Sequence, residues 1–311
     1  MQYINFFHSK KLMQTYERVP LHKPYMVVAF EGDKPIAHML VAKRNGKCRI
    51  FGEGEYHFYE DKKSDQNVNS EAQTSKSEED VFGEMLAAFT KTQHFPTLYI
   101  EVSDLSRKMF AYKHFRRNKF FPIHWLEVHN SLHSKSPIER ATKRTIRKVA
   151  YARKMGVTTS LVTTKEDFDR FYTVTRRYYN FHLRKFCPQK SFFQNLMNTD
   201  EGKLFITTYR GKVIATCVLA CTQGDAWLWF GAYQTKSHPR LNPDLITIWN
   251  AMNYAYVNGI QHFRFMDVGL PFFKNTYLDL ILNFGGKSVG TNRWFHFFPN
   301  ILQRIIRIFF K

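Results

Sequence analysis

The sequence predicts a mixed α/β protein built from two similar halves that a basic helix joins. The first observation is a repeat, because residues 27–42, VVAFEGDKPIAHMLVA, return at residues 205–220 as FITTYRGKVIATCVLA. The second is that a helix-patterned segment and a buried strand follow the repeated phrase in each half. The third is a segment rich in lysine and arginine between the halves. Repetition of this kind usually marks a duplicated fold unit, so we expect one mixed sheet in each half.

The first half, residues 1–135, begins its repeated unit with two apolar runs around a glycine turn, which is typical of a β-hairpin. Residues 60–80 are polar and rich in Ser, Asn, Gln and acids, so we expect a flexible insertion there. Residues 81–91 have helical periodicity, and residues 97–104, TLYIEVSD, read as a buried strand. No polar cluster comparable to that of the second half is expected after this strand.

A linking helix is predicted over residues 136–156. Ser136 and Glu139 form a capping-box pattern, and Gly156 provides a stop signal. Its basic residues recur at spacings of three and four, which places them on one face: Arg140, Lys143, Arg144, Arg147 and Lys148. The face is either a solvated surface or a contact for a polyanion, and we expect Arg144 and Arg147 to bind substrate.

The second half, residues 157–311, repeats the order of hairpin, helix and strand. Residues 226–233, AWLWFGAY, read as a strand, and residues 262–269, HFRFMDVG, as the next one. The helix between them has Asn242 at its N-cap, Pro243 in the first turn and Gly259 as its stop signal.

Charge is the compositional outlier. Of 311 residues, 46 are Lys or Arg and 26 are Asp or Glu, which gives a formal net charge of +20. Such an excess favours partners that are polyanions, namely nucleic acid, anionic lipid or phosphorylated substrates. The four cysteines form no disulfide framework or metal motif, and no signal-peptide pattern or apolar run of roughly 18 residues is present. We therefore expect a cytoplasmic protein with no metal site.

The second half and the basic helix together resemble a known family. The resemblance rests on residues 164–182, TKEDFDRFYTVTRRYYNFH, and on the run from YAYVNGIQHFRFMDVG to NFGGK. These segments resemble the FemAB-like acyltransferases, which are tandem domains of the GNAT (Gcn5-related N-acetyltransferase) fold. The resemblance implies two GNAT-like mixed-sheet domains, the first of them degenerate. It also implies transfer of an acyl or aminoacyl group to an amine, from acyl-CoA or aminoacyl-tRNA as co-substrate, with no tightly bound cofactor.

Two positions depart from the family pattern. The turn at residues 234–244, QTKSHPRLNPD, lacks the glycines with which CoA-using GNAT domains cradle a pyrophosphate, and Asp244 competes there for the positive end of the helix. Ile281 stands where related proteins commonly carry a lysine three residues before Phe-Gly-Gly. Lys274 is its nearest replacement.

The candidate site lies in the second half. Acyl transfer needs a donor placed beside an amine and stabilisation of an oxyanion. We expect Tyr233 to donate a proton to the leaving group and Lys274 to stabilise negative charge. Asp267 is the third catalytic candidate, because it lies at the end of its strand, where α/β sheets place functional groups. The donor is expected to contact Lys236, Arg240 and Asn242. The resemblance places acceptor binding on the basic, aromatic helix that carries Arg176, Tyr178, Tyr179 and His182. A purely structural role remains open for each, since tyrosines pack in cores and Asp267 can cap a turn.

Three function classes follow: an acyltransferase, a nucleic-acid-binding module, or a non-catalytic GNAT-like protein. In the first, the acceptor is an anionic molecule that bears an amine, for example a cell-envelope precursor. Residues 300–311 are apolar with Arg304 and Arg307 at adjacent turns, so they either contact an anionic membrane at its inner face or dock on their own domain. Donor class, acceptor and oligomeric state have no signature in the sequence.

Overall fold

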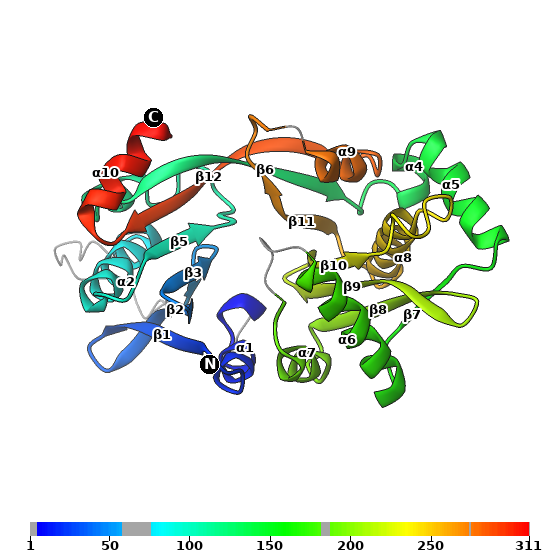
Figure 1. The fold of residues 1–311 in the computed structure, drawn as a ribbon. Coiled ribbons are helices and arrows are strands. Elements are labelled where there is room, and N and C mark those ends of the chain that lie inside the picture. Colours follow the sequence, from blue (N-terminus) through cyan, green and yellow to red (C-terminus); the bar gives the residue numbers. More distant parts are fainter. Residues whose placement is uncertain (1–4, 58–75, 182–186, 274, 311) are drawn as a thin grey trace, which may run out of the picture. The chain divides into compact units, whose positions relative to one another are not determined.

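The structure is a computed structural model that describes residues 5–57, 76–181, 187–273 and 275–310. The chain divides into two compact units (Figure 1). Unit 1 comprises residues 1–124 and 291–311, and unit 2 comprises residues 125–290. This division differs from the expected domains, 1–135 and 157–311, because the last strand of the chain belongs to the first unit.

Unit 1 contains a five-stranded sheet in the order β1–β2–β3–β5–β12. Its strands are β1 (His22–Glu31), β2 (Lys34–Arg44), β3 (Lys47–Phe51), β5 (Tyr99–Ser103) and β12 (Lys287–Phe297), and β4 (Glu55–Tyr56) pairs with β2. Its described helices are η1 (Phe6–His8), α1 (Lys10–Glu17), α2 (Glu78–Thr92), α3 (Tyr112–Arg117) and α10 (Asn300–Phe309).

Unit 2 contains a six-stranded sheet in the order β6–β11–β10–β9–β8–β7. Its strands are β6 (Phe121–Ser131), β7 (Thr158–Leu161), β8 (Gly202–Tyr209), β9 (Lys212–Thr222), β10 (Asp225–Tyr233) and β11 (His262–Gly269). Its described helices are α4 (Pro137–Arg140), α5 (Lys143–Lys154), α6 (Lys165–Asn180), α7 (Lys190–Met197), α8 (Pro243–Val257) and α9 (Thr276–Leu282).

The two sheets have the same topology. In unit 1 the successive pairs β1–β2, β2–β3, β3–β5 and β5–β12 are antiparallel, antiparallel, parallel and antiparallel. In unit 2 the pairs β8–β9, β9–β10, β10–β11 and β11–β6 follow the same sequence of directions. One long helix crosses between the parallel strands of each unit, α2 in the first and α8 in the second. The predicted tandem of mixed-sheet units is confirmed.

The repeated hairpins also agree residue by residue. In unit 1 Ala29 pairs with Ala37 and Phe30 with Pro35, so Ile36 is left over as a bulge. In unit 2 Thr207 pairs with Ala215 and Thr208 with Val213, so Ile214 is left over in the same way. The shared Ile-Ala step therefore marks one β-bulge at one place in both units.

The last strand in the order of each unit comes from the other half of the sequence. In unit 1, β12 from the end of the chain pairs with β5, and in unit 2, β6 from the first half pairs with β11. The sequence reading did not foresee this exchange, because it took each half as a continuous stretch.

Two predicted boundaries change. Helix α2 begins at Glu78, and the hydroxyl of Ser77 caps it by accepting a hydrogen bond from the Asp80 amide at 3.2 Å. Residues 78–80 of the expected insertion are therefore helical. Residues 60–75 of that insertion lie outside the described residues.

The predicted linking helix is two helices, α4 and α5. Ala141 is extended, and Thr142 caps α5 by accepting from the Thr145 amide at 3.3 Å, so the chain starts a new helix there. The capping box of Ser136 and Glu139 is confirmed.

Candidate active site

The parallel strands β10 and β11 separate toward their carboxyl ends. Their pairing covers only residues 225–228 of β10 and 262–265 of β11, although the strands continue to Tyr233 and Gly269. A bulge at Trp229 accompanies the point of separation. Diverging carboxyl ends of parallel strands are the usual place for a ligand in an α/β sheet.

Unit 1 has no such opening between the equivalent strands. There, β3 and β5 pair along their whole length, and the Gly52 amide donates a further hydrogen bond to the Ser103 carbonyl at 2.7 Å. Of the two units, only the second therefore offers this space within the described residues.

Four tyrosines gather at the opening in unit 2. Tyr178 and Tyr179 come from α6, Tyr233 from the end of β10 and Tyr277 from the first turn of α9. The rings of Tyr178 and Tyr233 lie edge to face with 6.4 Å between centroids. A backbone hydrogen bond from Gly231 reaches Tyr179. Burial raises the pKa of each of the four phenols, so all are neutral hydroxyl groups at physiological pH.

Tyr233 has an unusual position within this group. Its side chain folds back along β10 over Gly231, where a Cβ atom would collide with the Tyr233 hydroxyl oxygen. That hydroxyl is buried and has no hydrogen-bond partner among the described residues. A buried hydroxyl without a partner costs free energy, and such groups are often kept for a functional reason. Tyr233 therefore presents a proton donor that no described residue uses.

Asp267 lies on β11 at the same opening. It is exposed, its backbone is left-handed with φ 55°, and its negative charge raises the pKa of both Tyr179 and Tyr277. Asp104 occupies the equivalent position of unit 1. Each aspartate lies five positions after the first paired residue of its strand, His262 or Tyr99, and Asp104 is left-handed as well, with φ 59°.

The environments of the two aspartates differ. The Asp104 carboxylate is buried and lies 3.3 Å from an Arg49 nitrogen and 3.7 Å from an Arg293 nitrogen, while Glu101 lies 3.1 Å from Arg293. The segment at residues 97–104 thus carries an ion-pair network of its own, which the sequence analysis did not predict. In unit 1 the aspartate is held in an ion-pair network, whereas in unit 2 it faces the opening.

The predicted donor-binding residues lie around the start of α8. Lys236 and Arg240 are exposed in the turn after β10, and Asn242 is the N-cap of α8, with its side-chain amide donating to the Arg240 carbonyl at 3.0 Å. Asp244 occupies the positive end of the helix, because its carboxylate accepts a hydrogen bond from the Leu245 amide at 2.8 Å.

The pKa of Asp244 depends on its position at the start of α8. Burial raises its pKa, and hydrogen bonds and the nearby Lys148 of α5 act in the opposite direction. The basic helix α5 packs against α8.

The predicted acceptor residues divide between several places. Tyr178 and Tyr179 lie in the tyrosine cluster, whereas Arg176 lines a neighbouring hollow of about 340 Å³ on α6, together with Tyr172, Arg177 and Phe181. Phe181 is 78% exposed, and neither arginine has a carboxylate within salt-bridge distance among the described residues.

The remaining predicted residues are not in this cluster. Arg144 and Arg147 are exposed on α5. His182 and Lys274 lie outside the described residues, so the structure places neither. Tyr277 was missed by sequence reasoning, although Asn275 before it is a good N-cap signal for a helix that begins there.

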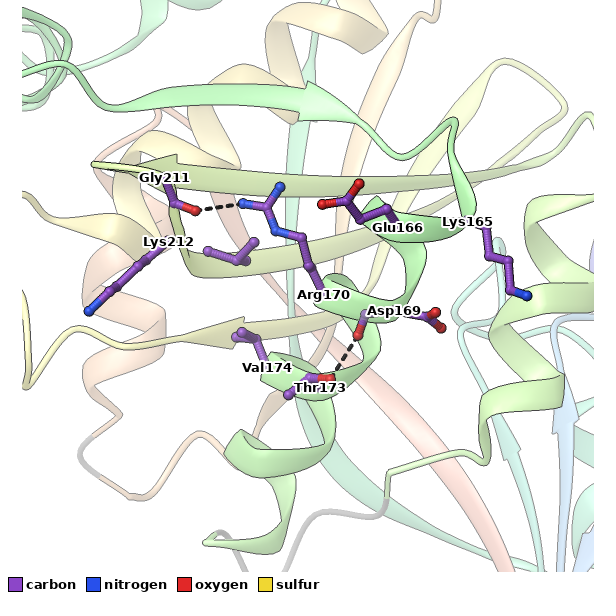
Figure 2. A pocket seen from close by; sticks show the side chains of 9 residues that line it. Lys165, Glu166, Asp169, Arg170, Thr173, Val174, Gly211 and Lys212 are labelled. Atoms are coloured by element: carbon purple, nitrogen blue, oxygen red, sulfur yellow. Dashed lines mark hydrogen bonds between the residues drawn. The ribbon is translucent and has the colours of Figure 1, made fainter.

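A larger hollow of about 610 Å³ lies along the first half of α6 and the β8–β9 turn (Figure 2). Arg170 points across it and donates to the Gly211 carbonyl at 2.8 Å, and it also pairs with Asp167. Asp169 on its rim pairs with Lys190. Because Arg170 and Asp169 already have partners, we place the reaction at the tyrosine cluster and not in this larger hollow.

Neither a metal site nor a membrane span is found in the described ranges. Over those residues no three His, Cys, Asp or Glu side chains gather closely enough to hold a metal ion. In the same part of the chain no helix is both long and apolar enough to cross a membrane.

Known proteins share the fold of this chain. Residues 139–274 match the model of the acetyltransferase (GNAT) domain. No curated protein matches the sequence. Among solved structures, FemX superposes with a TM-score of 0.64 at 10% identity, covering 97% of this chain and 94% of that one. L-PGS from Bacillus licheniformis superposes with a TM-score of 0.63 at 12% identity, covering 100% of both chains.

A third solved structure has a duplicated GNAT fold. It is a tandem GNAT protein from the clavulanic acid biosynthesis pathway, with a TM-score of 0.55 at 8% identity and coverage of 93% of this chain and 88% of that one. At these identities the structural matches establish the fold, and the domain match establishes the type of chemistry. Residues 139–274 therefore form a GNAT acetyltransferase domain, and the chain as a whole shares the fold of these solved structures.

Proposed function

We propose that this acyltransferase moves an aminoacyl group from aminoacyl-tRNA to an amine, in the opening between β10 and β11. The observation that carries the choice of donor is Asp244. In CoA-using GNAT domains a glycine-rich turn and the helix start bind the pyrophosphate, whereas here a carboxylate accepts the Leu245 amide and adds negative charge. A pyrophosphate at this helix end would meet repulsion and lose a hydrogen-bond donor.

The basic helix α5 supports a nucleic-acid donor. Arg144 and Arg147 are exposed, and neither has a carboxylate within salt-bridge distance among the described residues. Helix α5 packs against α8, and its Lys148 lowers the pKa of Asp244, so we propose that this basic face lies near the donor. Phosphates of a tRNA acceptor stem can therefore bind along α5 while the aminoacyl ester reaches the site.

The reaction forms a carbon–nitrogen bond and breaks the ester carbon–oxygen bond. In the proposal Asp267 orients the acceptor amine and takes its proton, and Lys274 stabilises the negative charge of the tetrahedral intermediate. Tyr233 gives its proton to the departing ribose oxygen. Asp267 then releases the proton of the amine to solvent, and Tyr233 regains one from solvent, which restores both groups. The raised pKa of Tyr233 keeps the proton in place until the leaving group needs it.

A second donor, acyl-CoA, is favoured by the match to the acetyltransferase (GNAT) domain. In that case the exposed Lys236 and Arg240, with Asn242, would bind the phosphates away from Asp244, as co-substrate contacts and not as a cofactor site. The leaving group would be a thiolate.

The acceptor in this proposal is an anionic, amine-bearing cell-envelope precursor. Arg176 and Arg177 in the hollow on α6 supply cations for phosphate, and Tyr172 and the exposed Phe181 supply aromatic surface beside them. Tyr178, Tyr179 and His182 are the proposed contacts closer to the reacting amine. The proposal places the enzyme in the cytoplasm, in peripheral contact with the inner face of the membrane.

The donor is tested by binding and transfer in parallel. We expect purified protein to transfer label from a mixture of aminoacyl-tRNAs to an amine acceptor, and to show no thermal shift with acetyl-CoA. Asp244→Ser should raise affinity for CoA, because it removes the competing carboxylate but keeps a capping side chain. Thiol release from acetyl-CoA by the wild type, without transfer from aminoacyl-tRNA, would replace the first donor by the second. Salt-sensitive RNA binding without transfer from either donor would leave only a nucleic-acid-binding module.

A further inference from the structure

We propose that α10 is an interfacial helix that docks unit 1 on the surface of an anionic lipid bilayer. This inference deepens the proposed function, which includes peripheral contact with a membrane, and its test requires neither a donor nor an acceptor. Helix α10 directly follows β12 (Figure 1).

One side of α10 holds the helix to its own unit. The Gln303 side chain donates from Nε2 to the Lys119 carbonyl at 2.6 Å and accepts at Oε1 from the Phe297 amide at 2.9 Å. Ile306, three positions later and therefore on the same side, is half-buried. The orientation of the helix on unit 1 is thus set by named contacts.

The opposite side of α10 is apolar and exposed. Its side chains recur at spacings of three and four, and none of them is buried: Ile301 71% exposed, Leu302 36%, Ile305 48%, Ile308 74% and Phe309 78%. Each such side chain gains about 1.5–3 kcal/mol when fully removed from water. A contiguous apolar face of this kind, directed away from its own unit, usually marks an interaction surface.

The positive charge beside the apolar face of α10 favours an anionic lipid bilayer as its binding partner. Arg304 and Arg307 border one edge of the apolar face, α10 contains no acid, and the whole chain has a formal net charge of +20. Apolar side chains in the acyl region with arginines at the headgroups are the arrangement of a helix that lies in a membrane interface. A second copy of this chain is a poorer occupant, since symmetric pairing would bring Arg304 and Arg307 of both copies together.

The test measures sedimentation of the full-length protein with vesicles, at one ionic strength and without any substrate. Vesicles of phosphatidylcholine with 30% phosphatidylglycerol are compared with pure phosphatidylcholine (roughly a third anionic lipid gives a clear surface potential). We expect binding to the anionic vesicles only. The variant Ile305→Ser/Ile308→Ser should lose about tenfold or more in partitioning. Val257→Ser, which removes a side chain that is 81% exposed elsewhere, is the matched control and should bind normally.

Each other outcome overturns the proposal. Equal binding of the double serine variant and the wild type would assign vesicle binding to basic residues elsewhere. Absence of wild-type binding would remove the bilayer as partner. A wild-type dimer in analytical ultracentrifugation that the double serine variant dissociates, without a change in vesicle binding, would assign the apolar face to a second copy. Unchanged melting temperatures show that the variants fold.

Discussion

Tyr233 shows how a single buried hydroxyl can be costly for the fold and useful for the reaction. Its oxygen is buried without a partner in the described part of the chain, beside a glycine that has no side chain to displace it. A phenylalanine would fit the same space and leave no unsatisfied group.

Tyr233→Phe is therefore predicted to lower turnover by about a hundredfold, the usual effect of losing a general acid. The free energy of unfolding should stay constant or rise by up to about 1 kcal/mol, because the lost hydroxyl has no partner. Steady-state kinetics and urea unfolding measure the two effects. Tyr254→Phe, on the buried side of α8 against Phe205, is the control. A normal turnover number in Tyr233→Phe would show that another group protonates the leaving atom.

The lowered pKa of the buried His8 makes the stability of the protein depend on pH. It is fully buried, its two ring nitrogens lie 3.1 Å from the Leu40 amide and 3.2 Å from the Gly54 amide, and burial lowers its pKa to about 3. Between pH 6.5 and 3 the unfolded chain binds a proton at His8 that the folded chain does not. Stability should therefore fall as the pH is lowered through this range.

The expected contribution of His8 is a loss of about 2 kcal/mol between pH 7 and pH 5. Urea unfolding measures the free energy of unfolding at each pH. The slope of this free energy against pH should correspond to the uptake of one proton fewer on unfolding in His8→Gln than in the wild type. Identical slopes would mean that His8 is already protonated in the fold.

At the scale of elements, local patterns were sufficient for the hairpins, α8 and β11, but not for the exchanged strands. Gly32 and Gly211, both at positive φ, mark the hairpin turns, and the limits of β11 agree with the sequence reading. The pairing of β12 with β5 joins residues almost 200 positions apart, which no local pattern encodes. Tyr233 and Asp267 could be proposed from the sequence because each lies at the end of a predicted strand. Tyr277 lies near them only in the folded chain, so no local pattern pointed to it.

Removal of two arginines from α5 is predicted to weaken the binding of the donor without changing the stability of the protein. Arg144→Gln/Arg147→Gln should raise the apparent KM for aminoacyl-tRNA and reduce the slope of its salt dependence by about 2, since two phosphate contacts are lost. The melting temperature should hardly change, because both side chains are exposed. Arg116→Gln/Arg117→Gln on α3 removes the same charge and should leave the slope unaltered. A lower melting temperature with a normal KM would assign α5 a structural role.

At the scale of the whole molecule, the exchanged strands make each unit depend on the distant half of the sequence. Arg293 of β12 is buried and pairs with Glu101 and Asp104 of unit 1, so the last strand brings the cation that these carboxylates need.

Arg293→Met should therefore destabilise the protein by about 3–5 kcal/mol, because it leaves buried carboxylates uncompensated. Arg116→Met, at an exposed position, should change stability by less than about 0.5 kcal/mol. Denaturant unfolding compares the two variants. Equal stability would mean that solvent reaches the Glu101 and Asp104 carboxylates.

The central claim is that the duplicated units have divided their tasks, with the reaction in unit 2 and an ion-pair network at the equivalent place in unit 1. The most direct test compares turnover per folded molecule in Asp267→Asn and Asp104→Asn. Asp267→Asn should lower turnover by about a hundredfold and leave the melting temperature unchanged, since Asp267 is exposed. Asp104→Asn should lower the melting temperature and leave turnover per folded molecule near normal, since its carboxylate is buried against Arg49 and Arg293. Near-normal turnover in Asp267→Asn, or loss of turnover in folded Asp104→Asn, would contradict the account.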